Sequence, residues 1–433
     1  MIDVQTFLPT DPEAAARSAL TPTMMAMKGS AILAIAGQVR ALKAQGRTIC
    51  DLTVGDFSAD QFQVPDALVT EMDLAARAGH TNYPPADGIP ELKSAIVDLY
   101  RDRMGQSWPE GSVCVASGAR PPIYAAWRLF VEPGDRTISF LPMWNVGYYA
   151  QLTEADHHFI PTTAESNFFP TVEQVAAALP GTRMVCLNSP LNPTGTVIDA
   201  DVLRGIATAI VDENRRRARL SGRDARPVML LYDQVYWMLT APGVVHHTPV
   251  SLVPEIAPYV VHVDAISKCF AATGLRVGWA VLPPHLQTRM RSLIGHIGAW
   301  APRNIQLATA KILRDPAAVD RIMADMRAGV QARLDRLYEG VTSLADEGFP
   351  ISAIAPQGAI YLSLRVDLIG QGFETNEALR VWMLNEAGLA LVPFQAFDLD
   401  VETGWFRASV GAVGLAELDT AIERLRDAFK RRR

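Results

Sequence analysis

The central part of the chain alternates between short apolar runs and longer stretches with helical spacing. Between about residues 65 and 325, each apolar run is followed by a segment in which apolar positions recur every three or four residues. The clearest strand-like runs are Ser112–Ala116, Arg136–Phe140, Met184–Leu187, Val228–Tyr232, Val260–Val263 and Gly278–Leu282. Strands and helices in alternation predict an α/β protein with a mainly parallel sheet that helices cover on both faces.

The beginning of the chain follows a different pattern. Residues 1–25 contain prolines and little periodicity, which predicts an arm or a loosely packed lead-in. Apolar positions then keep helical spacing from Ser30 to Ala44, and Gly46 follows as a stop signal. We therefore expect a helix directly after the arm.

The C-terminal part also departs from the alternating pattern. A long amphipathic stretch (about 303–345) precedes strand-like Ile360–Leu364 and Trp405–Ser409, and a charged helix is expected over Ala416–Arg433. This order predicts a smaller α+β unit beside the central one. The expected domains are an N-terminal arm (1–25), a small domain (26–60 with 325–433) and a large domain (61–324).

Composition and charge are those of a globular protein without a polyanionic partner. Of 433 residues, 49% are hydrophobic and 20% charged, which argues against a disordered chain. Acidic residues outnumber basic ones 46 to 40, giving a formal net charge of −6. Nucleic-acid binding normally shows the opposite balance, so we expect no nucleic-acid partner.

Cysteine spacing and the absence of several motifs narrow the possible chemistry. The 4 cysteines form no CxxC pair, and no HExxH motif is present, so no metal site is expected. The first residues lack a basic region followed by an apolar one, and uncharged runs such as Thr137–Thr153 contain prolines or glycines, so we expect a cytoplasmic protein without a membrane span. A P-loop, a GxSxG motif and a GxGxxG turn after a strand are also missing.

The strongest local signal is the segment Ser267–Gly278, which follows the apolar run Val260–Val263. A lysine at this place, Lys268, would lie at the carboxyl end of a buried strand, where α/β folds bind ligands. Burial would lower its pKa and favour the neutral amine, which forms a Schiff base with an aldehyde. Arg276 offers a forked cation suited to phosphate. A surface lysine after a strand would give the same local pattern.

The segment Ser267–Gly278 resembles the SK-x-F-x-x-x-G-x-R-x-G motif of class I and II aminotransferases of fold type I, which bind pyridoxal phosphate. Further segments resemble the family in the same order from about Met27 to Ser409. The resemblance implies a seven-stranded, mainly parallel sheet and a smaller domain. It also implies transfer of an amino group from an L-amino acid to a 2-oxo acid by a ping-pong mechanism. Lys268 would hold the cofactor, with Ser267 beside it, and act as the general base.

Two further segments correspond to the family's cofactor-ring contacts. Asn188–Gly195 is similar to N-x-P-x-NPTG, which implies that Asn192 binds the phenolic oxygen of the cofactor. Leu231–Tyr236 is similar to D-E-x-Y with a glutamine in the second position, so Asp233 would pair with the pyridinium nitrogen and Tyr236 would reach the phenolic oxygen. A carboxylate buried at a strand end needs a cation, although Asp233 could instead cap the next helix.

Two other segments correspond to the family's contacts with the phosphate and with the face of the ring. The segment after the first strand resembles the S/T-x-G-A turn, in which free N–H groups at a helix start hold the phosphate. Trp144 falls where the family places an aromatic residue on the pyridine ring, although a core tryptophan is the simpler interpretation. The implied phosphate contacts are Ser117, Gly118 and Ala119, with Arg120 either adding a contact or pointing away.

The resemblance also supplies candidate substrate and partner contacts. Arg407, in the family's R-x-S/A strand, would bind the substrate α-carboxylate with two parallel hydrogen bonds. Gly55 stands in a shortened form of the L-x-x-G-E-P-D-F segment, near the substrate. Tyr83 corresponds to a tyrosine that reaches the partner's phosphate, which implies a homodimer with shared sites.

Substrate choice is open at this stage. The segment ending in Ser30 resembles the opening helix of prokaryotic aspartate aminotransferases, and Arg303 would bind a second carboxylate unless it is a surface arginine. We favour aspartate or glutamate with 2-oxoglutarate. Aromatic amino acids are the next candidates, because Trp300 and Tyr361 would line the pocket. A β-lyase reaction with the same cofactor is also possible. A regulator's ligand domain is disfavoured, because residues 1–25 are too few for a DNA-binding domain.

Overall fold

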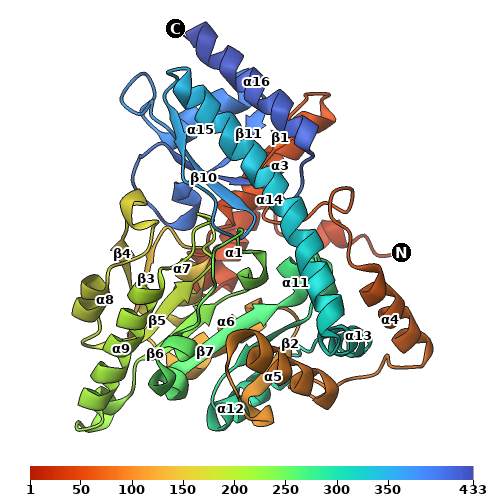
Figure 1. Cartoon of the computed structure of the whole chain (residues 1–433), viewed down its shortest axis with the longest axis vertical. Helices are drawn as coiled ribbons and strands as arrows, with labels where there is room; N and C mark the ends of the chain where they lie inside the picture. Colours follow the sequence, from red (N-terminus) through yellow and green to blue (C-terminus); the bar gives the residue numbers. More distant parts are fainter. Residues whose placement is uncertain (433) are drawn as a thin grey trace.

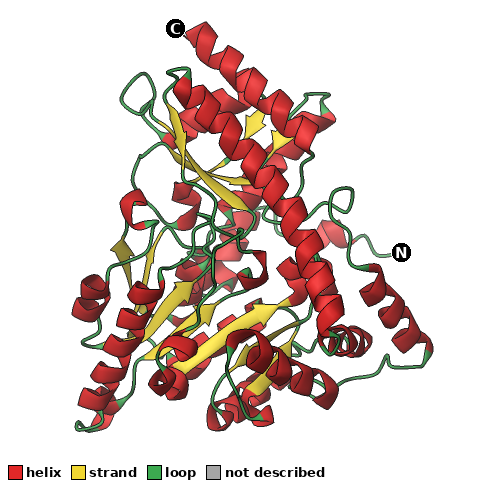
Figure 2. Cartoon of the chain, in the orientation of Figure 1, coloured by secondary structure: helices red, strands yellow, loops and turns green. Residues whose placement is uncertain are grey.

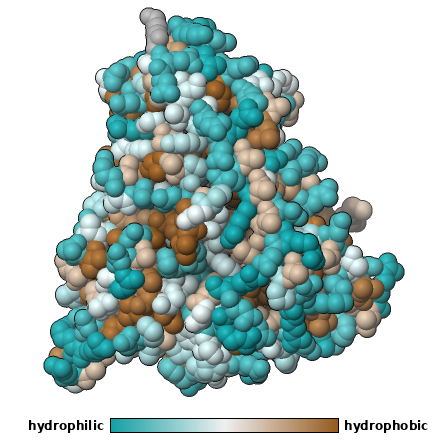
Figure 3. Space-filling view, viewed as in Figure 1, coloured by the Kyte–Doolittle hydropathy of each residue, from teal (hydrophilic) through white to brown (hydrophobic). Residues whose placement is uncertain are grey.

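The computed structural model describes residues 1–432 and shows two regions connected by one long helix (Figure 1, Figure 2). The region at the bottom of Figure 1 contains the larger sheet, and the region at the top contains smaller sheets and the C-terminus. Helix α14 (Pro316–Asp346) runs from one to the other. The face in view is mostly polar, with apolar patches beside α14 and at the lower left (Figure 3). Within residues 1–432, no helix has the length and hydropathy needed to cross a membrane.

The larger sheet has seven strands in the order β2-β8-β7-β6-β5-β3-β4. β8 is antiparallel to both neighbours, and all other pairs are parallel, which confirms the predicted mainly parallel sheet. The strands are β2 (Val113–Ala116), β3 (Arg136–Leu141), β4 (Asp156–Pro161), β5 (Thr182–Asn188), β6 (Met229–Asp233), β7 (Val260–Ala265) and β8 (Gly278–Val281).

The edge strand β4 is the one strand of this sheet that the apolar runs do not indicate. It begins Asp156-His157-His158, and no residue in it is fully buried. By contrast, every residue of β2, β7 and β8 is buried, because helices cover both faces of the sheet there. An exposed edge strand needs no continuous apolar run, so its sequence signal is weak.

Ten helices, four of them short, accompany the larger sheet. Helix α6 packs against α7 and α12, α8 packs against α9, and α13 packs against α4 and α5. These helices are α4 (Asp66–Arg77), α5 (Pro90–Met104), α6 (Arg120–Phe130), α7 (Val146–Thr153), α8 (Val172–Ala178), α9 (Ala200–Arg217), α10 (Pro249–Leu252), α11 (Ile266–Cys269), α12 (Pro284–His296) and α13 (Arg303–Leu313).

The second region is built on two small sheets. The strands of the four-stranded antiparallel sheet run in the order β12-β13-β10-β9, and β1 pairs with β11 in a parallel two-stranded sheet. The strands are β1 (Cys50–Asp51), β9 (Ile351–Ala353), β10 (Tyr361–Val366), β11 (Leu389–Ala390), β12 (Val392–Pro393) and β13 (Trp405–Ser409). Its helices are α3 (Ala31–Ala44), α15 (Asn376–Glu386) and α16 (Leu415–Arg432).

The N-terminal arm is more regular than the sequence predicts. It forms α1 (Pro12–Ala19) and α2 (Pro22–Met25), each with proline in the first turn, where no backbone N–H is missed. Asp11 and Thr21 cap these helices, and neither helix contains a buried residue. The prolines that suggested irregular chain therefore start helices, whereas the loose packing is as expected.

The helix boundaries differ from the expected ones in the stretch 303–345 and at the C-terminal helix. The amphipathic stretch 303–345 forms two helices, because α13 ends at Leu313 and Asp315 then accepts the N–H of Ala318 at 3.0 Å as the N-cap of α14. The terminal helix α16 ends at Arg432 in the described part of the chain, and the predicted last residue, Arg433, lies outside it. The division into an arm and two domains stays a prediction, and α14 passes residue 325 without a break.

The two regions meet at the turn that follows β5. The hydroxyl of Ser363, in β10, donates to the carbonyl oxygen of Thr194 at 2.9 Å. Gly195 has a φ of +74°, and a Cβ there would collide with the backbone of Tyr361, so only glycine permits this approach. The turn therefore places the carboxyl ends of the large sheet against β10 and β13.

Candidate active site

Three adjacent strands of the large sheet bring most of the predicted site residues together. β5, β6 and β7 are parallel neighbours, so their carboxyl ends open at one edge of the sheet. At this edge lies a cavity of about 430 Å³. The predicted residues that line it are Ser30, Gly55, Ala119, Arg120, Trp144, Asn192, Asp233, Tyr236, Ser267, Lys268, Arg276 and Arg407.

Lys268 lies in α11, immediately after β7, with its amine inside the cavity. Its Nζ donates to the carbonyl oxygen of Gly55 at 2.6 Å. Burial lowers the pKa of Lys268 to about 8, and the positive charges of Arg407 and Arg120 act in the same direction, while Asp56 opposes them. A sizeable fraction of the amine is therefore neutral near pH 7 to 8 and is able to act as a nucleophile or base.

Asp233 ends β6 and has no cationic partner within ion-pair distance among residues 1–432. Its carboxylate accepts the N–H of Val235 at 3.2 Å, which is a local turn contact, and it is not the N-cap of the short helix that follows. Burial raises the pKa of Asp233 to about 6. A buried carboxylate in this state is stabilised by any cation that enters the cavity.

Arg407, in the middle of β13, is a fully buried cation with unused hydrogen-bonding capacity. One terminal nitrogen donates to the carbonyl oxygen of Thr53 at 2.6 Å and the other to Oδ1 of Asn192 at 3.1 Å, while Nε has no partner within residues 1–432. The guanidinium lies over the rings of Tyr361 and Phe397. Since no carboxylate of the described chain pairs with it, Arg407 is suited to bind an anionic group from solution.

A pair of tyrosines and a glycine fix the wall beside Lys268. The hydroxyls of Tyr236 and Tyr361 are 2.6 Å apart, and burial raises the pKa of both. A Cβ at Gly55 would lie 2.8 Å from the hydroxyl oxygen of Tyr361, so a side chain does not fit there. Because Gly55 has no side chain, its backbone comes close to Tyr361, and its carbonyl oxygen accepts the hydrogen bond from Nζ of Lys268.

The segment Ser117–Arg120 forms a cradle at the start of α6. Gly118 has a φ of +88°, and a Cβ there would lie 2.7 Å from Cζ of Arg276. Arg276 itself donates to the carbonyl oxygens of Ser117 at 2.9 Å and Thr273 at 2.7 Å. The N–H groups of Ser117 and Gly118 already donate to the carbonyl oxygens of Ala299 and Ala116, so the N–H groups that remain for a ligand are those of Ala119 and Arg120. Together with the Arg276 guanidinium they make a site that suits a phosphate group.

Arg120 and Trp144 form a pair inside the cavity. The guanidinium carbon of Arg120 lies 4.6 Å from the centroid of the Trp144 ring, a cation–π arrangement. Trp144 is partly buried and also packs against the core, Arg120 is exposed, and both line the cavity. The Arg120 side chain lines the cavity, and its contact with the phosphate stays a prediction.

Sequence reasoning missed two charged residues of the cavity. Arg40 lines it from α3 together with Leu33 and Ala36, which recur at helical spacing on one face. A cation on that otherwise apolar face is the signal that could have found it. Asp56 lines the cavity beside Gly55 and accepts the hydroxyl of Thr273 at 2.7 Å.

Two predicted residues lie away from the cavity within one chain. The Tyr83 side chain is 80% exposed, and its ring packs edge-on against Trp300 at 4.9 Å between centroids. Arg303 donates to Oδ1 of the neighbouring Asn82 at 2.6 Å. These residues form one surface cluster (Asn82, Tyr83, Trp300 and Arg303), which we call the Tyr83 cluster.

Comparison with known proteins identifies the family of the chain. The pattern of the aminotransferase class I and II family matches residues 47–425. The chain belongs to this family. It is 28% identical over 411 residues to an aspartate aminotransferase of Geobacillus stearothermophilus, covering 94% of this chain and 98% of the relative. It is 29% identical to an aspartate/prephenate aminotransferase of Thermus thermophilus, with 95% and 97% covered.

Solved structures give the same result for the fold. The aspartate aminotransferase of Rhizobium meliloti superposes with a TM-score of 0.85 at 27% identity, covering 95% of this chain and 99% of that chain. This confirms the predicted fold of type I. The chain is accordingly a transaminase of the aspartate aminotransferase subfamily, and its family depends on pyridoxal phosphate.

Proposed function

We propose that this transaminase transfers the amino group of L-aspartate or L-glutamate to a 2-oxo acid such as 2-oxoglutarate by a ping-pong mechanism. The observation that carries the proposal is the presence of Arg120 in the same cavity as Arg407. Two separate guanidinium groups suit a substrate with two carboxylates, one on each. Arg40 adds a further positively charged side chain to the lining, which also contains Lys268 and Arg276.

The cavity residues fit pyridoxal phosphate. Asp233 is a buried carboxylate that lacks a cation, which a protonated ring nitrogen would supply. The cradle at Gly118, with Arg276, would hold the phosphate, and Asn192 and Tyr236 would contact the phenolic oxygen. When bound, the cofactor supplies an aldehyde for the amino group and a ring that accepts the electrons of the broken Cα–H bond.

The protein's own part in the reaction is positioning and proton transfer. Lys268 would hold the cofactor and, once displaced by the substrate amine, would take the proton from Cα as a neutral amine. Arg407 would bind the α-carboxylate and so direct the Cα–H bond toward Lys268. Ile32, Leu33 and Ile123 line the cavity with apolar atoms, which would limit water near the reacting atoms.

Arg303 lies away from the cavity of its own chain, but the proposed substrate is still an amino acid with two carboxylates. Within one chain it lies in the Tyr83 cluster and does not line the cavity, so we assign the second carboxylate to Arg120. We propose that the Tyr83 cluster is completed by a second copy of the chain, so that Tyr83 reaches the partner's phosphate-binding cradle in a homodimer. The exposure of Tyr83 and its edge-on packing against Trp300 support this.

We also propose a cytoplasmic location.

Replacing Arg120 tests the substrate assignment. We expect Arg120→Gln to lower kcat/KM for aspartate and glutamate by about 10- to 100-fold, because a charge-assisted hydrogen bond is lost, and to change kcat/KM for phenylalanine by less than about threefold. Arg128→Gln, an exposed arginine on the same helix, is the matched control. An equal loss for all three amino acids would contradict the assignment.

Aromatic amino acids are the second candidate substrates. Tyr361 and the apolar side chains Ile32, Leu33 and Ile123 line the cavity and favour them, whereas Trp300 lies in the Tyr83 cluster. A kcat/KM for phenylalanine above that for aspartate would select this candidate. A β-lyase reaction would show itself as pyruvate and ammonia released from a suitable amino acid without any 2-oxo acid.

A further inference from the structure

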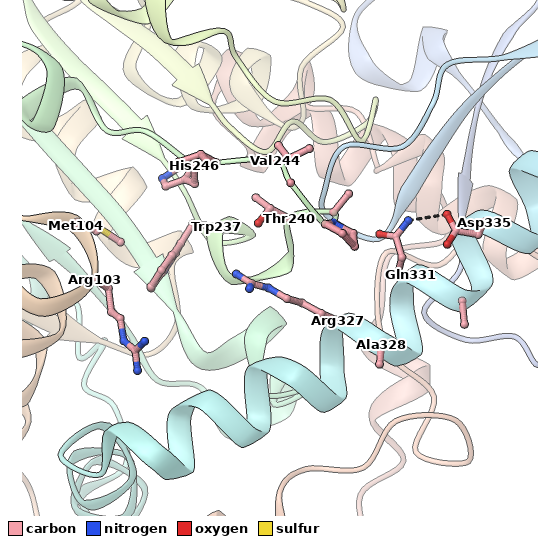
Figure 4. Close-up of a pocket in the computed structure, with 15 residues that line it drawn as sticks. Arg103, Met104, Trp237, Thr240, Val244, His246, Arg327, Ala328, Gln331 and Asp335 are labelled. Carbon is pink, nitrogen blue, oxygen red and sulfur yellow. Dashed lines mark hydrogen bonds between the residues drawn. The ribbon is translucent and has the colours of Figure 1, made fainter.

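A second cavity, which we call the α14 cavity, lies outside the site described above. It is bounded by the segment 237–246, by α14 and by the end of α5 (Figure 4). Its volume is about 830 Å³, within the range of small-molecule sites. Nothing in the proposed transamination uses it.

Arg327 is the central charge of the α14 cavity. Its side chain leaves α14 and extends into the space between Trp237 and Thr240 (Figure 4). Nε donates to the carbonyl oxygen of Met238 at 2.6 Å, and no carboxylate of residues 1–432 forms an ion pair with Arg327. By contrast, Arg103 at the cavity edge is paired with Asp320 at 2.7 Å.

The surroundings of Arg327 disfavour its charge in the absence of a ligand. Partial burial lowers the pKa of Arg327, and the nearby charge of Arg103 lowers it further, while Asp320 opposes this. Asp335 is the carboxylate among the lining residues, and it accepts the amide of Gln331 at 2.6 Å. An anion bound at Arg327 would compensate a charge that the protein itself leaves unpaired.

The remaining walls suit an organic body. The Trp237 indole is held in place because its Nε1 donates to the buried carboxylate of Asp264 at 2.7 Å. Met104 and Val244 add apolar surface. Nδ1 of His246 is buried and has no hydrogen-bond partner in the described part of the chain, and burial lowers the pKa of His246 to about 3, so the ring is a neutral polar group.

We propose that the α14 cavity binds a small organic anion, with a carboxylate or phosphate group on Arg327 and an apolar or aromatic body against Trp237 and Val244. The ligand would contact the segment that follows β6, on the side opposite the transamination cavity. Tyr236 lines the first cavity and the next residue, Trp237, lines the second, while His246 approaches Gln234, the neighbour of Asp233, at 3.5 Å.

Titration calorimetry of the cofactor-loaded protein tests the proposal with two probes, phenyl phosphate and benzoate. We expect at least one to bind with one site per chain, and the probe that binds more tightly identifies the anionic group. Arg327→Gln should weaken binding by about 10- to 100-fold. Ala328→Trp, which fills the cavity from an exposed position on α14, should weaken it at least as much without touching Arg327.

Two controls decide where the probe binds. Arg321→Gln removes an exposed charge from the same helix, and Arg407→Lys alters the transamination site; neither should change the affinity by more than about twofold. Loss of binding in Arg407→Lys with full binding in Arg327→Gln and Ala328→Trp would overturn the proposal. So would the absence of binding of both probes at about 10 mM. If Arg327→Gln melts at a lower temperature than the unmodified protein, Ala328→Trp decides the outcome.

Discussion

The cavity at the ends of β5, β6 and β7 and the Tyr83 cluster differ in how far one chain completes them. In the cavity, Lys268 is hydrogen-bonded to the backbone, and Arg407 is fully buried with its donors directed inward. In the Tyr83 cluster, Tyr83 is 80% exposed, and its ring packs against that of Trp300. The first is an internal site that packing fixes, whereas the second is a surface whose proposed function needs another copy of the chain.

This difference separates two kinds of prediction. Substitutions in the cavity should act within a single chain and should change chemistry or substrate binding strongly. Substitutions in the Tyr83 cluster should have smaller effects, and those effects should pass from one subunit to the other.

Replacing Lys268 with alanine should have the largest effect. Because the same amine anchors the cofactor and moves the Cα proton in the proposed mechanism, turnover should fall by at least about 10³- to 10⁴-fold. Steady-state assays with aspartate and 2-oxoglutarate measure this. Lys311→Ala, on the exposed side of α13, should keep full activity. A Lys268→Ala protein that retained a tenth of the activity would exclude Lys268 as the base.

Replacing Arg407 with lysine should come next. Lysine keeps the charge but cannot make two parallel hydrogen bonds to a carboxylate, so kcat/KM should fall by about 100-fold for every amino acid tested. The uniform loss distinguishes Arg407 from Arg120, whose loss should be selective for dicarboxylates. Arg365→Lys, on the neighbouring strand β10 and paired with the exposed Asp367, is the control.

Asp233→Asn should have opposite effects with and without the cofactor. The folded-state pKa of Asp233 is raised from 3.8 to about 6, so the cofactor-free protein loses stability as the pH rises through this range. The amide removes that penalty, and above pH 6 the variant should be more stable by on the order of 2–3 kcal/mol, with no difference below about pH 4. With cofactor, the variant should instead bind it more weakly.

Thermal melting at several pH values, with and without pyridoxal phosphate, measures both effects. Burial of the carboxylate raises the pKa of Asp233, and the charge of Lys268 opposes this only in part, so the sign reversal is specific to a cationic ligand at Asp233. A cofactor-free variant less stable than the unmodified protein above pH 6 would show that Asp233 is stabilised by the fold itself. Asp212→Asn, a surface residue of α9 paired with Arg215, should change neither curve.

The internal site was largely predictable from the sequence, because it is encoded locally. Asp233, Asn192 and Lys268 each follow an apolar strand at a short distance, and parallel strands bring their ends to one edge. The same logic located six of the seven strands of the large sheet. It failed for β4, whose polar edge position leaves no apolar run.

Residues placed by contacts distant in sequence could not be predicted in the same way. Arg40 reaches the cavity only because α3 packs with its Leu33 face toward the cavity. The sequence alone does not indicate which face of α3 packs there. The direction of the Arg120 side chain depends on Trp144, which comes from a different strand end. Arg303 was expected to meet the substrate, a contact that the resembled family often makes from the partner subunit. Within one chain it donates to Asn82 in the loop before α5, so its substrate contact stays a prediction.

Tyr83→Phe should have the smallest effect of the four. Loss of one hydroxyl contact to the phosphate should weaken cofactor binding by about tenfold while leaving kcat at saturating cofactor nearly unchanged. Tyr338→Phe, on α14, is the control. Cofactor release during dialysis, followed by absorbance, gives the affinity. Unchanged affinity in Tyr83→Phe would remove this residue from the phosphate site.

Mixed dimers show whether Tyr83 acts across the interface. In a dimer of one Lys268→Ala chain and one Tyr83→Phe chain, sharing between subunits places both substitutions in the same site and leaves the other site intact. Half of the normal activity should then persist with normal cofactor affinity. If Tyr83 served its own chain, the only active site would carry the Tyr83→Phe change, and its affinity would be about tenfold weaker. The affinity of the surviving site therefore separates a shared site from a self-contained one.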